Sequence, residues 1–141
     1  MTDKFKQISN KPGFMKHNGG ILFRKISNTE FEFKVTIDEN KLNSAGITHG
    51  GYICSIIDAG SGTAAHRATD NTPCVTISLD IKFIGATKTG DEIKGFTKIQ
   101  KITKSMVFLV CYLESNSRLV ASASGVWKKL NKNISDFGPG G

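Results

Sequence analysis

The chain has 141 residues, 38% of them hydrophobic and 22% charged, which fits one folded domain and excludes a disordered chain. Nineteen Lys and Arg residues against twelve Asp and Glu residues give a net charge of +7 at pH 7. This balance suits a nucleic acid, an anionic membrane surface or a polyanionic small ligand, and does not choose among them. The longest apolar run, residues 106–113, is far shorter than the ~20 residues of a membrane-spanning helix.

No secretory signal, disulfide framework or metal motif is visible. The N-terminus has no apolar stretch, and Cys54, Cys74 and Cys111 are odd in number and widely spaced. The three histidines lack the spacing of a zinc site. We therefore expect a soluble cytoplasmic protein with buried structural thiols and no metal.

The N-terminal third predicts a short amphipathic segment followed by a hairpin. Residues 1–20 are amphipathic around Phe5 and Ile8. Apolar and polar residues then alternate from Ile21 to Ile37, with a turn at residues 27–29. An alternation with a period of two is typical of β-strands.

Residues 50–69 predict the one long helix, because apolar and small residues recur at helical spacing. Thr48 is the expected N-cap, and residues 70–73 end the helix. The small residues on this helix would let another layer approach closely. The predicted core face consists of Ile53, Ile56, Ile57, Gly60 and Ala64.

From Pro73 to about Trp127, the sequence pattern predicts β-strands. Four runs of strand-forming residues, separated by turns near residues 88–91, 103–104 and 114–117, end near Trp127. We expect residues 1–130 to form one α+β domain, with one long helix packed on five or six antiparallel strands. The polar, glycine-rich tail at 131–141 is expected to be disordered.

The apolar run from Met106 to Leu113 has apolar residues at both parities. A strand with one buried face should alternate, so both of its faces are expected to be covered. One helix covers only one face, and we therefore infer a second subunit on the other. The alternative cover is the N-terminal segment.

The stretch from Asn43 to Gly51, followed by Asp58, contains the candidate chemistry. The His-Gly-Gly sequence at a helix start presents unpaired backbone N–H groups, where the helix dipole favours developing negative charge. Glycine also lets a substrate carbonyl come close to the backbone. Asp58 lies about 100–140° away from the apolar stripe, where a carboxylate can act as a general base or a nucleophile. The alternative interpretations are that Gly50 and Gly51 simply form a loop before the helix, and that Asp58 is a solvated surface residue.

These residues resemble the hotdog-fold thioesterases, specifically the phenylacetate-pathway (PaaI-type) subfamily. The resemblance extends from about Phe14 to Lys129. A related hydroxybenzoyl-CoA type has glutamine and glutamate where this chain has Asn43 and Asp58. The matching features are Asn43-x-x-Gly46-x-x-His49-Gly50-Gly51, Asp58, Thr76, the Gly90-Asp91 turn and Gly125-Val126-Trp127.

The resemblance implies a role for each catalytic candidate. The Gly50 N–H would polarise the thioester carbonyl, and Asp58 would activate water or attack directly. Asn43 would orient substrate or water, and Thr76 would stand near the attacking water. His49 would be a positioning residue.

The resemblance also implies hydrolysis of acyl-CoA to free acid and coenzyme A, with no cofactor beyond the coenzyme A of the substrate. Active sites would lie between subunits of a homodimer that assembles into a homotetramer. Gly51 would contact the substrate, and Lys101 and Lys104 would meet the phosphates of coenzyme A, with Lys128 a weaker candidate.

Other functions are less well supported. A non-catalytic acyl-CoA-binding hotdog module, such as a ligand sensor, remains an alternative, although residues 1–20 are too short for a usual helix-turn-helix. A nucleic-acid-binding domain would interleave basic and aromatic residues on one face, whereas the aromatic residues here are mainly phenylalanines at core positions. We expect neither nucleic acid nor membrane as a partner. A glycine pattern at residues 60–65 imitates a dinucleotide fingerprint inside a helix, and no G-x-S-x-G elbow occurs.

Overall fold

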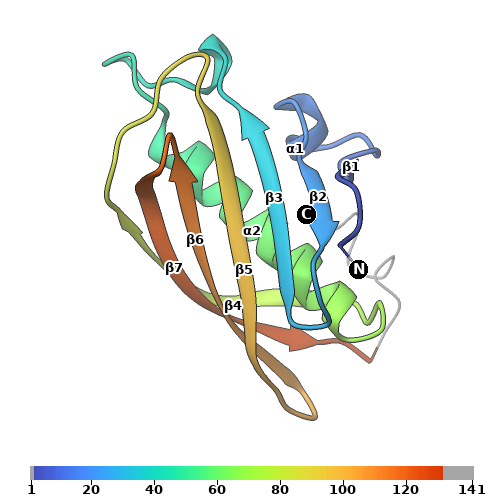
Figure 1. The fold of residues 1–141 in the computed structure, drawn as a ribbon. Coiled ribbons are helices and arrows are strands. Elements are labelled where there is room, and N and C mark those ends of the chain that lie inside the picture. Colours follow the sequence, from blue (N-terminus) through green and yellow to red (C-terminus); the bar gives the residue numbers. More distant parts are fainter. Residues whose placement is uncertain (1, 132–141) are drawn as a thin grey trace.

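The computed structural model describes residues 2–131, which form one antiparallel sheet with a long helix across one face (Figure 1). The long helix is α2 (Gly50–Ala68), and the shorter elements are helix α1 (Phe14–His17) and the 3-10 turn η1 (Glu39–Lys41). The strands run in the order β1-β2-β3-β5-β6-β7-β4 across the sheet. They are β1 (Lys6–Gln7), β2 (Leu22–Lys25), β3 (Glu30–Thr36), β4 (Cys74–Phe83), β5 (Glu92–Ile102), β6 (Met106–Ser115) and β7 (Arg118–Lys129).

This architecture confirms the predicted α+β domain with one long helix on an antiparallel sheet. The described residues form seven strands rather than five or six, because the N-terminal segment adds the two-residue β1 alongside β2. No helix in the described part of the chain is long and apolar enough to cross a bilayer. The tail predicted to be disordered lies outside the described residues from position 132 onward.

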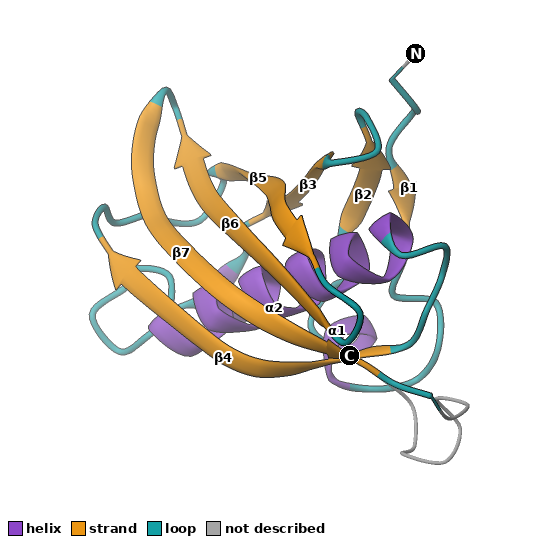
Figure 2. Ribbon diagram, turned by 90° about the horizontal axis from the view of Figure 1, so that it is seen from below, coloured by secondary structure: helices purple, strands orange, loops and turns teal. Residues whose placement is uncertain are grey.

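Small residues bring α2 close to the sheet. The Phe33 ring of β3 lies between Gly60 of α2 and Gly95 of β5, and a Cβ atom at either glycine would overlap the ring. Phe33 is consequently fully buried. Figure 2 shows α2 crossing the strands on this face. The prediction that small residues permit a close approach to the helix is therefore confirmed.

Strand β6 has one covered face and one open face. Val107, Leu109, Cys111 and Leu113 are buried on the face that carries α2, whereas Phe108 and Tyr112 on the other face remain 37% and 43% exposed. The N-terminal segment lies along β2 and does not shield them. The alternative in which this segment covers β6 is therefore wrong, and the second face is open in the single chain.

Strand β4 is an edge strand of the described sheet. It pairs with β7 alone, so its other edge presents unpaired backbone groups that favour pairing with another chain. Its apolar residues are also uncovered, because Ile77 and Phe83 are 54% and 58% exposed. This edge lies beside α2, which brings it next to the candidate site.

The close contact at Gly60 gives a stability prediction. Gly60→Ala should lower the free energy of unfolding by about 1–3 kcal/mol, because a methyl group would force the Phe33 ring to move. Gly62→Ala is the matched control on the same helix, since its Cβ would lie 3.2 Å from the indole nitrogen of Trp127. The gain in helix propensity should keep that variant within about 1 kcal/mol of the wild type. Urea unfolding measures both variants, and equal destabilisation would contradict the packing argument.

Candidate active site

A compact loop leads into α2. Leu42 and Thr48 form an isolated antiparallel bridge, and the Asn43 N–H donates to the Ile47 carbonyl at 2.7 Å. The side-chain oxygen of Asn43 accepts hydrogen bonds from the N–H groups of Ala45 and Ile47 at 2.9 and 3.3 Å. Gly46 completes the turn with a φ of +82°. Asn43 therefore shapes the loop with its oxygen, and its amide nitrogen has no hydrogen-bond partner in residues 2–131.

His49, and not Thr48, is the N-cap of α2. The Nδ1 atom of His49 accepts a hydrogen bond from the Gly51 N–H at 2.7 Å, so this nitrogen carries no proton. The Thr48 hydroxyl instead lies 2.6 Å from the hydroxyl of Thr87, and both residues are buried. The predicted Thr48 cap is therefore wrong, because this threonine clamps the loop to the β4–β5 connection.

The Gly50 N–H is the one donor in the first turn of α2 without a partner among the described residues. Gly51 donates to the His49 ring, and Tyr52 and Ile53 both donate to the His49 carbonyl. The ring of Phe83 passes 3.5 Å from the position that a Gly50 Cβ would occupy. The free N–H thus lies beside an apolar wall at the positive end of the helix dipole.

Asp58 and Thr76 form a second polar cluster. The Thr76 hydroxyl donates to Asp58 Oδ1 at 2.6 Å, and Asp58 is half-buried on α2. Thr76 stands on β4 immediately before a register shift in the pairing with β7. The second carboxylate oxygen, Oδ2, has no hydrogen-bond partner within residues 2–131, which leaves it free to accept a hydrogen bond.

The two clusters are separate within one chain. Gly50 and Asp58 stand eight residues apart on the continuous helix α2, about 12 Å along its axis. One thioester carbon cannot contact both groups at that distance. The structure thus brings Asn43, His49, Gly50 and Gly51 together at the start of α2, and Asp58 together with Thr76 further along.

The predicted phosphate-binding lysines lie elsewhere. Lys101 pairs with Phe108 on the outer face of the sheet, near the end of β5 that is about 30 Å from Glu92 along the strand. Lys104 lies in the β5–β6 turn, and Lys128 pairs with Met106 on the same outer face. The structure does not bring these lysines to Gly50 within one chain.

Two other basic residues lie next to the loop and were missed from the sequence. Lys88 and Arg118 line a cavity of about 360 Å³ together with Ile47. Asp91 holds the cavity wall, since it accepts hydrogen bonds from the Lys88 backbone N–H at 2.9 Å and from the Asn116 amide at 3.3 Å. The sequence does predict a turn at residues 88–91, but it does not show that this turn lies beside the loop that contains Ile47.

The cysteines are free thiols. Cys111 is buried, as predicted, whereas Cys54 and Cys74 are half-buried. Burial raises the pKa of Cys111 to about 11 and also raises the pKa of Cys74. These two thiols therefore stay protonated near neutral pH and are poor nucleophiles.

Comparison with known proteins gives the family. The thioesterase superfamily matches residues 45–121. "Putative esterase PA0474" of Pseudomonas aeruginosa is 34% identical over 110 residues, which cover 77% of this chain and 82% of that protein. "Putative esterase SSO1253" of Saccharolobus solfataricus is 30% identical over 109 residues, covering 77% of this chain and 72% of that protein. The chain belongs to the thioesterase superfamily, which supports thioester hydrolysis as its general activity.

Solved structures show the same fold. Thioesterase superfamily member 2 of zebrafish has a TM-score of 0.79 at 20% identity, covering 86% of this chain and 90% of that one. A mutant of the phenylacetic acid degradation protein PaaI of Thermus thermophilus has a TM-score of 0.73 at 17% identity, covering 81% of this chain and 96% of that one. The chain therefore has the hotdog fold, which confirms the fold implied by the sequence resemblance.

The N-cap at His49 is testable through stability. His49→Ala should lower the free energy of unfolding by about 1 kcal/mol, because the Gly51 N–H loses its acceptor. His49→Asn keeps an acceptor at the cap and should recover most of that loss. Chemical denaturation of both variants at neutral pH measures the difference. Equal stability of the Ala and Asn variants would exclude the capping role.

Proposed function

We propose that this protein is an acyl-CoA thioesterase of the PaaI type that works in the cytoplasm. The observation that carries the proposal is the unpartnered Gly50 N–H at the start of α2, in a chain that also presents the Asp58–Thr76 pair. An oxyanion donor and a carboxylate base are the two groups that thioester hydrolysis by water requires. The chemistry needs no metal or cofactor beyond the coenzyme A of the substrate.

The proposed mechanism is general-base hydrolysis. Oδ2 of Asp58 takes a proton from water, while the Thr76 hydroxyl holds Oδ1 in place. The water oxygen attacks the thioester carbon, and the Gly50 N–H stabilises the oxyanion that develops. The C–S bond then breaks, and the thiolate of coenzyme A receives the proton from Asp58. In this proposal the side-chain amide nitrogen of Asn43, which has no partner in residues 2–131, orients the substrate.

Direct attack by Asp58 is the alternative chemistry. The carboxylate would form a mixed anhydride and expel the thiolate, and water would then cleave the anhydride. A single turnover in ¹⁸O-water detects the anhydride when water cleaves it at the aspartyl carbon. General-base hydrolysis leaves no label in Asp58, whereas attack of water on the aspartyl carbon of the anhydride would leave ¹⁸O in its carboxylate.

We propose that the complete site needs two copies of the chain. The separation of about 12 Å between Gly50 and Asp58 requires that the base comes from another copy. The unpaired edge of β4 lies beside both groups, and pairing between two β4 edges would form the homodimer. The open outer face around Phe108 and Tyr112 then supports assembly of two dimers into a homotetramer.

Coenzyme A would bring several phosphate charges to the rim of this site. Lys101 and Lys104 were the candidates from the sequence, whereas Lys88 and Arg118 lie on the cavity beside Ile47. The geometry of the single chain favours the second pair because it adjoins the loop that leads to Gly50. Lys101 and Lys104 would contact the phosphates only if dimerisation brings them to the site of a neighbouring copy.

The role of Asp58 is tested by Asp58→Asn. Loss of the base should lower kcat by about 100-fold or more, while the oligomer seen by sedimentation and the binding of substrate persist. Thr76→Ala should lower kcat less, and Thr76→Ser should restore it because the hydroxyl returns. Assays on a panel of acyl-CoA substrates measure these effects. Full activity in Asp58→Asn would contradict the mechanism, and binding without turnover in the wild type would favour a ligand sensor.

The phosphate-binding residues are tested by paired charge removals. Lys88→Ala with Arg118→Ala should raise KM for an acyl-CoA by about tenfold, because charge-assisted contacts to phosphate are lost. KM for the matching acyl-pantetheine, which lacks the phosphates, should not change. Lys101→Ala with Lys104→Ala is the parallel variant. A larger effect of the parallel variant would assign the phosphates to the outer face of the sheet.

A further inference from the structure

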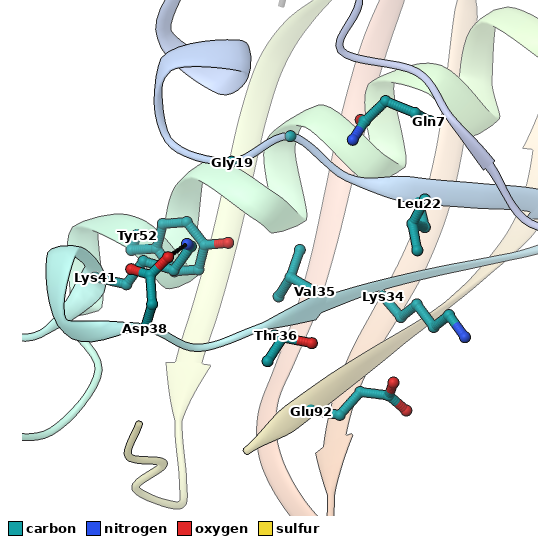
Figure 3. Close-up of a pocket in the computed structure, with 11 residues that line it drawn as sticks. Gln7, Gly19, Leu22, Lys34, Val35, Thr36, Asp38, Lys41, Tyr52 and Glu92 are labelled. Atoms are coloured by element: carbon teal, nitrogen blue, oxygen red, sulfur yellow. Dashed lines mark hydrogen bonds and ion pairs between the residues drawn. The ribbon is translucent and has the colours of Figure 1, made fainter. Parts of the chain in front are cut away.

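A cavity of about 310 Å³ has Tyr52 as its lining residue from α2. It opens between the N-terminal segment and the end of β3, and Figure 3 shows its side chains. Tyr52 lines it, whereas Gly50 and Asp58 do not. Tyr52 lies about 200° around the helix from Gly50. The cavity is therefore separate from the thioesterase site.

Two glycines create the opening. Gly19 and Gly20 have φ values of +95° and +71°, a left-handed conformation that L side chains rarely adopt. They turn the chain away from β3, so the β2–β3 ladder ends at the pair of Leu22 and Lys34. The Ile21 N–H donates to the side-chain oxygen of Gln7 at 2.9 Å, and the Ile21 carbonyl accepts from the Ile8 N–H at 3.1 Å, so both backbone groups of Ile21 face β1 and neither is bonded to β3. The gap that remains leads inward past β3.

The Tyr52 hydroxyl lies buried without a partner in this cavity. Tyr52 is only 6% exposed, and its hydroxyl forms no hydrogen bond with any described residue. Burial first, and the charge of Asp38 second, raise the pKa of this phenol. The group is therefore a neutral O–H donor at neutral pH. Figure 3 shows its oxygen directed toward the space between Gly19 and Val35.

A buried ammonium group lies beside the tyrosine. The Lys41 side chain is 5% exposed, and its Nζ donates to Asp38 Oδ2 at 2.8 Å. The same Nζ lies 5.5 Å from the centre of the Tyr52 ring. A Cβ at Gly19 would come within 3.1 Å of Nζ, so the absence of a side chain keeps the space beside the ammonium open.

The charges favour a ligand with one negative charge. Asp38 and Glu92 balance Lys34 and Lys41 in the lining, but the Asp38 side chain is 55% exposed and Glu92 is exposed as well. Solvent screens these two carboxylates more than it screens the buried Lys41. The interior therefore attracts an anion, while the two carboxylates near it disfavour a dianion such as phosphate.

We propose that this cavity binds a small monocarboxylic acid at a site separate from the proposed active site. The carboxylate accepts hydrogen bonds from the Tyr52 hydroxyl and the Lys41 ammonium. The apolar body of the acid packs against Val35, which is buried, and Leu22, which is partly exposed at the mouth. The site recognises a single acidic group on a short apolar molecule.

Amide chemical shifts of ¹⁵N-labelled protein test the site. Hexanoate and benzoate are the probes, and hexanamide, benzamide and inorganic phosphate are their controls. The carboxylates should shift the signals of Gly19, Gly20 and Val35. Tyr52→Phe should weaken this binding by about tenfold, because one donor to the carboxylate is lost. Tyr112→Phe is the matched control on the outer face of the sheet and should leave binding unchanged.

A second variant tests the role of Lys41. Asp38→Asn frees the ammonium from its competing carboxylate, so hexanoate should raise the Tm of this variant more than that of the wild type. Equal binding by Tyr52→Phe would overturn the proposal. Equal shifts with the neutral amides or phosphate, or shifts confined to Gly50 and Asp58, would overturn it as well. The latter result would place the acid in the thioesterase site.

Discussion

The close contact between α2 and the sheet is the constraint on which the rest of the structure depends. The Phe33 ring occupies the space between Gly60 and Gly95, and this sets the line that the helix follows across the strands. On that line, Asp58 meets Thr76 and Gly50 meets the ring of Phe83. Both groups of the candidate site are thus held by packing between one helix and the edge strand. A larger residue at Gly60 would alter the site without touching it.

The same helix separates the two groups that the proposed chemistry needs. An oxyanion donor belongs at the first turn, where backbone N–H groups lack partners. A carboxylate can stand only at positions off the core face, and Asp58 stands about 12 Å further along. A single chain cannot close this distance because an α-helix rises about 1.5 Å per residue. In the proposed site, pairing at the unpaired edge of β4 therefore joins the two sheets and also brings the base of one copy to the Gly50 N–H of the other.

The helix and the strands were predictable because their periodicity depends on one buried face. Features that depend on contacts between distant loops were not. The apolar run in β6 indicated two covered faces, but the single chain covers only the face that carries Leu109. Thr48 has the chemistry of a common N-cap, yet Thr87 engages its hydroxyl and His49 becomes the cap. Among the predicted site residues, Asp58 and Thr76 are the pair that contact each other from two different elements, α2 and β4.

The net charge of +7 is a further case in which the sequence does not show which distant residues lie together. Some of the cations are already engaged within the chain, since Lys41 is buried against Asp38 and Arg24 contacts Glu32 at 2.6 Å. Lys101 and Lys104 stand at one end of the sheet, whereas Lys88 and Arg118 stand beside the loop that precedes α2. A long polyanionic substrate would therefore meet different cations according to the direction in which it leaves the thioester carbon. The position of each cation relative to Gly50, and not their sum, determines which of them contribute to binding.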